Sequence, residues 1–168
     1  MRKFLKAIYI VIVCFCLFLF WFSLNHKPDL KPKSIPKFNF KDFYNDNINQ
    51  SNLDPNKQKL IIYLNPECDY CSIEIENLIH WENKDQYQIL LVFQTDTDKK
   101  TLNHFIEKYH LLEFESIQVL LDGDDQFPIQ FYEDKVPCSF LFDTNNKLVR
   151  KKKGLIDVEI FCKTEKQS

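Results

Sequence analysis

The fold of this chain is constrained most by a regular alternation of two hydrophobic patterns between residues 60 and 109. Residues 60 to 64 and 87 to 93 are short apolar runs rich in β-branched and aromatic side chains, which is typical of strands buried on both faces. After each run, apolar residues recur at helical spacing, over residues 69 to 81 and 102 to 109. Strands and helices that alternate in this way predict a layered α/β sandwich.

The rest of the chain extends this domain on both sides. The elements predicted after residue 110 are a strand (117 to 121), a brief helical piece (127 to 132), a hairpin (139 to 142 with 147 to 150) and a last helix (158 to 163). Alternating residues 38 to 40 predict a small strand or hairpin before the main fold. We therefore expect one globular domain over residues 38 to 168.

An uncharged run over residues 7 to 24 precedes this domain, and its only strongly polar residue is Ser23. Its length is at the lower limit for a helix that crosses a hydrocarbon core of about 30 Å. Arg2, Lys3 and Lys6 before it would also suit a cleaved signal peptide, but the run is long and lacks a small-x-small cleavage site. We predict an uncleaved signal anchor over residues 1 to 25, with Cys14 and Cys16 as apolar residues of its helix.

We interpret residues 26 to 37 as a spacer between this anchor and the domain. Pro28, Pro32 and Pro36 recur in it among lysines, a composition that favours an extended, semi-rigid chain. Over the whole sequence, 22 Lys and Arg nearly balance 24 Asp and Glu. Such a balance provides no broad cationic field, so we do not expect nucleic acid as a partner.

Two cysteines, Cys68 and Cys71, lie where the first predicted strand meets the first predicted helix. The first would lie beside the unpaired N–H groups and the positive end of the helix, which stabilise a thiolate, and the second would lie one turn further in. This arrangement favours reversible disulfide chemistry. Structural zinc is the alternative, but Cys138 and Cys162 have no His between them and do not form a second ligand pair, so no metal site is predicted.

Val136 and Pro137 immediately precede the strand that begins at Ser139, and a cis peptide bond is expected between them. Together with the Cys68 and Cys71 pair, this placement resembles the thioredoxin superfamily over residues 59 to 165. With the predicted anchor and spacer, the chain is most similar to the membrane-anchored group that includes cytochrome-maturation thiol reductases. The resemblance implies a thioredoxin-like three-layer sandwich with a mixed sheet and no cofactor. It also implies that Cys68 attacks, Cys71 resolves, and Val136 and Pro137 hold the extended peptide of a partner.

Residues around the cysteine pair depart from the usual thioredoxin pattern. Glu67 replaces the usual Trp, and Asp69 and Tyr70 replace the usual Gly-Pro. Carboxylates at 67 and 69 oppose thiolate formation, which predicts a reducing rather than a strongly oxidising pair. Glu74 resembles an acidic residue that tunes the thiols in the subgroup, with a solvated residue of the first turns as the alternative.

The other two cysteines of the predicted domain have simpler interpretations. Cys138 follows the expected cis-proline and is either a third redox thiol or a small buried residue. Cys162 is interpreted as a core residue.

These features predict a membrane-tethered, extracytoplasmic thiol-disulfide oxidoreductase that reduces protein disulfides. Its partners would be protein clients and a membrane electron donor. It would be anchored in the inner membrane by residues 7 to 24, with its domain in the periplasm or exterior. Two other classes stay open: a chaperone that binds Cu(I) through Cys68 and Cys71, and a redox-inactive interaction domain on the same fold.

Overall fold

The computed structural model describes residues 8, 12–21, 30–94 and 98–163, and the chain divides into two compact units, Met1–Leu30 and Lys31–Ser168. In the first unit, residues 12–21 form a helix with exposed side chains. Within the described ranges, no helix combines the length and apolar character needed to cross a membrane. Residues 7, 9–11 and 22–24 of the predicted span, and residues 26–29 of the predicted spacer, lie outside the described residues.

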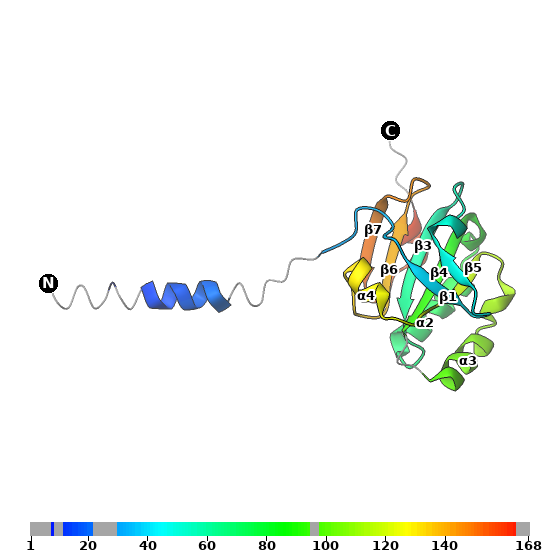
Figure 1. The fold of residues 1–168 in the computed structure, drawn as a ribbon, viewed down its shortest axis with the longest axis horizontal. Helices are drawn as coiled ribbons and strands as arrows, with labels where there is room; N and C mark the ends of the chain where they lie inside the picture. Colours follow the sequence, from blue (N-terminus) through cyan, green and yellow to red (C-terminus); the bar gives the residue numbers. More distant parts are fainter. Residues whose placement is uncertain (1–7, 9–11, 22–29, 95–97, 164–168) are drawn as a thin grey trace. The chain divides into compact units, whose positions relative to one another are not determined.

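The second unit is built on a seven-stranded sheet in the order β2-β1-β5-β4-β3-β6-β7 (Figure 1). Its strands are β1 (Asn39–Asp42), β2 (Asn47–Asn49), β3 (Gln58–Leu64), β4 (Tyr87–Gln94), β5 (Ile117–Asp122), β6 (Cys138–Phe142) and β7 (Leu148–Lys153). Strand β3 is central, parallel to β4 and antiparallel to β6. The β4 and β5 strands are parallel, whereas β1 and β7 pair antiparallel with β5 and β6. The predicted α/β sandwich with a mixed sheet is confirmed, and so is the small N-terminal hairpin, formed by β1 and β2.

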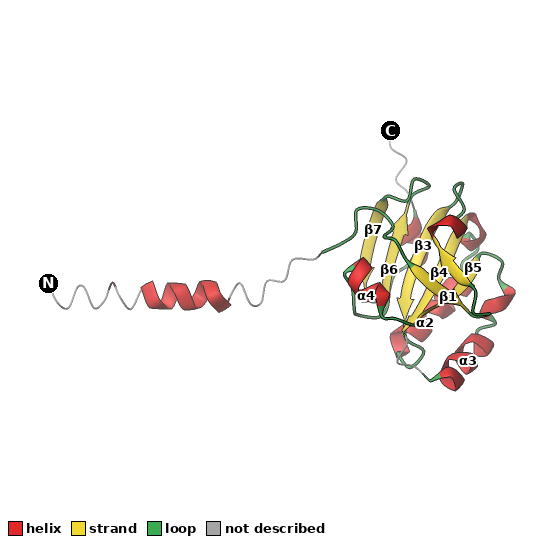
Figure 2. Cartoon of the chain, viewed as in Figure 1, coloured by secondary structure: helices red, strands yellow, loops and turns green. Residues whose placement is uncertain are grey.

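Helices and short 3-10 turns connect these strands, as Figure 2 shows. They are α2 (Asp69–Ile79), α3 (Lys99–Lys108), α4 (Gln126–Phe131), α5 (Val158–Cys162), η1 (Gln50–Asn52), η2 (Lys84–Gln86) and η3 (Leu111–Glu113). Helix α3 begins three residues earlier than its apolar pattern predicted. The carboxylate of Asp98 accepts hydrogen bonds from the backbone N–H groups of Lys100 and Thr101, which starts the helix before its first buried residue.

The sheet separates two apolar cores, because side chains alternate across a strand. Leu60, Ile62 and Leu64 of β3 pack with buried residues of α2, α3 and α5, and we call this side the α2 face. Ile61 and Tyr63 pack with buried residues of α4 and of the N-terminal segment, on what we call the α4 face. Every β3 residue from Lys59 to Leu64 is therefore buried, as predicted for a central strand.

The segment just before β1 lies along the outer edge of β7. Ser34 forms an isolated bridge with Lys147, Ile35 donates its N–H to the carbonyl of Asn146 at 2.9 Å, and Lys33 accepts from Leu148 at 3.0 Å. An edge strand offers unpaired backbone groups, and this segment satisfies some of them. Residues 33–35, which the sequence assigned to the spacer, are therefore part of the domain.

Candidate active site

The loop that leads from β3 into α2 is shaped by Asn65, the residue directly after the strand. Its side-chain oxygen accepts from the N–H of Glu67 at 2.8 Å, and its carbonyl accepts from the N–H of Cys68 at 3.1 Å. Its amide nitrogen donates to the side chain of Gln94, at the end of β4, at 3.0 Å. Asn65 thus fixes the start of α2 at the carboxyl end of two parallel strands.

Cys68 is the N-cap of α2, the position that the sequence predicted for the first thiol. Its backbone is extended, and its carbonyl accepts from the N–H groups of Cys71 and Ser72 at 3.0 and 3.1 Å. Its side chain makes no capping hydrogen bond and is half-buried. The sulfur therefore does not cap the helix; the side chain is partly exposed and lies at the positive end of an eleven-residue helix.

Cys71 lies one turn into α2 and is completely buried. Burial raises the pKa of its thiol well above the usual range, and a hydrogen bond to Cys68 and the neighbouring Glu74 raise it further. A backbone hydrogen bond from Asn65 acts in the opposite direction and is weaker. The pair is therefore asymmetric, with one accessible thiol and one buried thiol that keeps its proton.

Glu74 is also buried, with 2% of its surface exposed, so the solvated alternative for this residue is wrong. Its carboxyl group accepts from the hydroxyl of Ser139 in β6 at 3.3 Å and from the N–H of Ile156 at 3.0 Å. Burial raises its pKa to about 7, although these two hydrogen bonds and the charge of Lys152 act to lower it. A carboxyl group that titrates near neutral pH thus lies one turn beyond Cys71 on the same side of α2.

The Val136–Pro137 peptide bond is cis, as the sequence predicted. Pro137 is buried, Val136 is half-buried, and the carbonyl of Pro137 accepts from the N–H of Gly154 at 2.8 Å. Gly154 has a φ of 77°, a value that suits glycine at this bend after β7. The hydrogen bond between Ser139 and Glu74 then ties the strand that follows the proline to α2.

The loop between α4 and β6 is held by a second buried carboxylate, Glu133. It lies 3.1 Å from the Nζ of Lys151 and 2.9 Å from that of Lys153, and it accepts from the N–H of Lys135 at 3.2 Å. Burial acts to raise its pKa, but the hydrogen bonds from the two lysines prevail and the pKa is lowered. Glu133 is therefore an anion that fastens this loop to β7.

The remaining predicted residues around the cysteines lie at the surface. Glu67, Asp69 and Tyr70 are exposed, with 62% of Tyr70 accessible to solvent. They surround Cys68 in sequence and in space, since they occupy the loop and the first turn of α2. Their predicted influence on the redox pair stays a prediction.

The two other cysteines of the domain lie on opposite faces of the sheet. Cys138 packs on the α4 face, away from Cys71, which packs on the α2 face, and this placement favours its reading as a small buried residue. Cys162 is buried on the α2 face, as predicted for a core residue, and burial raises the pKa of its thiol to about 12. In the described ranges, no group of three or more His, Cys, Asp or Glu side chains is placed to hold a metal ion.

Sequence reasoning missed Ser139 and Glu133. A serine within the apolar run of residues 139 to 142 was a weak signal for Ser139, because a hydroxyl in a buried strand needs a partner. Glu133 gave no signal, since its lysine partners lie in a strand nearly twenty positions further along the chain.

No protein-family model matches this sequence, and no curated protein matches it. Several solved structures share its fold. The thioredoxin domain of a thiol-disulfide oxidoreductase from Bacteroides vulgatus is 19% identical with a TM-score of 0.63, and the match covers 80% of this chain and 99% of that one. StoA from Bacillus subtilis is 16% identical with a TM-score of 0.60, covering 77% and 96%. A thio-disulfide isomerase from Thermus thermophilus is 17% identical with a TM-score of 0.62, covering 79% and 92%. These likenesses confirm the thioredoxin-like fold of the domain.

Proposed function

We propose that this protein is a thiol-disulfide oxidoreductase that uses Cys68 and Cys71 to reduce disulfides in protein clients. The observation that carries the proposal is the asymmetry of the pair: Cys68 is half-buried at a helix N-cap, and Cys71 is buried with a raised pKa. An accessible sulfur suits attack on a client, and a buried neighbour suits resolution of the intermediate.

The reaction proceeds by two exchanges. The Cys68 thiolate attacks one sulfur of the client disulfide, which forms a mixed disulfide and releases one client thiolate. Cys71 then loses its proton and attacks the sulfur of Cys68, which releases the second client thiolate and leaves a Cys68–Cys71 disulfide. Two electrons pass from the dithiol to the client.

Glu74 supports the second exchange. Cys71 holds its proton strongly, so its attack requires a nearby base. Glu74 lies one turn away on the same helix, and its pKa of about 7 lets it accept a proton near neutral pH. It has the features of a general base for the resolving thiol.

The reducing direction is supported by the charges beside Cys68. Strong oxidants of this chemistry owe their potential to a stabilised thiolate. Glu67 and Asp69 place two exposed carboxylates next to Cys68, which oppose that stabilisation. The pair would then donate electrons to clients, and a membrane protein would re-reduce it.

We also propose that residues 7 to 24 anchor the chain in the inner membrane, with the domain in the periplasm or exterior. The supporting observations are the uncharged run and the exposed apolar side chains of the helix at residues 12–21, including Phe15, Phe18 and Trp21. An apolar helix surface of this kind favours a lipid environment. Labelling of intact cells with a membrane-impermeant maleimide tests the orientation, because reduced Cys68 must be reached from outside.

The reaction is tested by measuring the reduction potential of the Cys68–Cys71 pair and by trapping clients in cells. A Cys71→Ser variant is expected to accumulate mixed disulfides, whereas the matched Cys68→Ser variant is expected to trap none. Equal trapping by both variants would contradict the assigned roles. A potential near about -120 mV, as in dedicated oxidants, would reverse the direction.

A further inference from the structure

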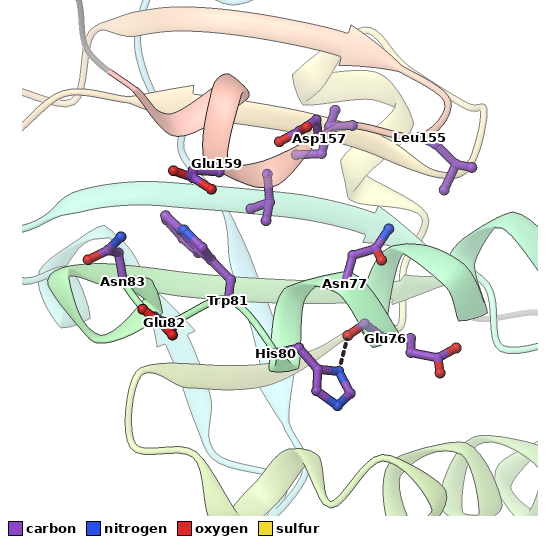
Figure 3. Close-up of a pocket in the computed structure, with 11 residues that line it drawn as sticks. Glu76, Asn77, His80, Trp81, Glu82, Asn83, Leu155, Asp157 and Glu159 are labelled. Atoms are coloured by element: carbon purple, nitrogen blue, oxygen red, sulfur yellow. Dashed lines mark hydrogen bonds between the residues drawn. The ribbon is translucent and has the colours of Figure 1, made fainter.

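A groove of about 860 Å³ lies at the far end of α2 from Cys68. Figure 3 shows its two walls: the end of α2 with the loop after it, and the segment of residues 155–159 that leads into α5. Neither cysteine of the pair, nor Glu74, Val136 or Pro137, lines it. The groove therefore does not include the thiol pair, although Ile156, whose N–H donates to Glu74, lines it.

Negative charge gathers along both walls. Glu82 lies on one wall and Glu159 on the other, and Glu76 and Asp157 add two more exposed carboxylates to the lining. Among the described residues, no lysine or arginine lines the groove. The last turn of α2 carries no basic residue, so the negative end of its dipole is not offset there. The electrostatics of this groove favour a cationic ligand.

Trp81 supplies a second and independent feature. Only 8% of its surface is exposed, and its Nε1–H finds no hydrogen-bond acceptor in the described part of the chain. Figure 3 shows its ring extending from the end of α2 into the groove, towards Glu159. A buried donor without an acceptor is unfavourable, and a ligand that brings an oxygen acceptor would satisfy it.

Apolar side chains complete the lining, at Leu155, Ile156 and Val158. A ligand that fits all three features needs a cationic group, an oxygen acceptor nearby and apolar surface. A peptide segment with lysine or arginine has all of them, because each charged side chain carries methylene groups and each residue carries a carbonyl.

We propose that this groove binds a basic segment of a partner protein. The ammonium or guanidinium groups of the segment lie against Glu82 and Glu159, and one of its backbone carbonyls accepts from Nε1 of Trp81. The site is independent of the thiol chemistry, so it stands whether or not Cys68 and Cys71 act as a redox pair.

The test uses the full chain in detergent micelles with Trp21→Phe, which leaves Trp81 as the one tryptophan of the sequence. The probes are an acetylated peptide of alternating arginine and alanine and a matched peptide of alternating glutamate and alanine. We expect a saturable change in Trp81 fluorescence with the arginine peptide, weakened by added salt, and none with the glutamate peptide. Absence of a saturable change, or equal responses to both peptides, would overturn the proposal.

Matched charge variants locate the binding site. Glu82→Gln combined with Glu159→Gln is expected to weaken the arginine peptide about tenfold or more. The control combines Glu115→Gln with Asp134→Asn, two exposed carboxylates that do not line the groove, and is expected to change affinity less than about twofold. Equal losses in the two double variants would show a general charge effect and refute a site at this groove.

Discussion

Glu74 and Glu133 are both buried beside the candidate active site, yet they are held in opposite states. Glu74 accepts hydrogen bonds from a hydroxyl and a backbone N–H, and burial raises its pKa to about 7. Glu133 is equally hidden, but Lys151 and Lys153 overcome the effect of burial and its pKa is lowered. The contrast teaches that burial alone does not decide the role of a carboxyl group. Lys151 and Lys153 make Glu133 a fixed anion. Among the described residues, Glu74 has only the charge of Lys152 acting on it, so burial prevails and the group can exchange a proton near neutral pH.

The largest effect is expected from removing the fixed anion. Glu133→Ala leaves Lys151 buried without this partner, since only 4% of that lysine side chain is exposed. Breaking a buried ion pair on one side lowers the free energy of unfolding by about 3–5 kcal/mol. Urea unfolding of the reduced chain measures the loss, with Glu115→Ala as an exposed control. A loss no larger than that of the control would show that Glu133 does not hold the loop.

The pH dependence of stability should reveal the proton on Glu74. Below pH 4.5 the group is protonated in both states; between pH 4.5 and 7 the unfolded chain releases the proton and the folded chain keeps it. Stability contributed by this group is therefore lost as pH rises, by about 3 kcal/mol between pH 4.5 and pH 8. Urea titrations at pH 4.5 and at pH 8 should show that the free energy of unfolding of the wild type falls by this amount relative to that of Glu74→Gln. A constant difference between the two proteins would place the pKa of Glu74 near its ordinary value.

The same carboxyl group should control the resolving step. In Glu74→Gln, conversion of a Cys68–glutathione mixed disulfide to the Cys68–Cys71 disulfide should slow about tenfold or more, because the base for Cys71 is gone. The rate of the wild type should rise with pH through an inflection near 7, as Glu74 deprotonates. The control variant Glu133→Gln should keep the inflection near pH 7. If the inflection disappeared in this control, it could not be assigned to Glu74 rather than to Glu133.

The smallest effect is expected at the outer partner of Glu133. Lys153 is about half exposed, so solvent and salt screen its ion pair. Lys153→Met should lower stability by no more than about 0.5 kcal/mol. Lys151→Met, at the buried partner, should cost several times as much in the same urea assay. Equal losses would mean that both lysines share the pairing evenly.

The elements of the fold were largely predictable because their signals are local. Apolar runs and helical spacing located β3, α2, β4 and β5 to within a few residues, and the Val136–Pro137 cis bond followed from a proline at the start of a strand. The candidate thiols were predictable for the same reason, since Cys68 and Cys71 lie at a junction that the sequence marks clearly. The boundary of the spacer was not, because the pairing of Ile35 with Asn146 joins segments far apart in the chain.

The sequence by itself therefore determined the order of strands and helices and the place of the cysteine pair at the start of α2. Only the tertiary structure decided the burial, placement and charge pairing of the groups around the cysteine pair. Burial of Glu74 against Ser139 and Ile156, the direction of Cys138 towards the α4 face, and the pairing of Glu133 with Lys151 all depend on contacts between distant segments. The physical reason is that the protonation state of a group depends on its desolvation and on nearby charges, which arise from packing between distant segments. Strand and helix periodicity, by contrast, depends on residues that are close in the sequence.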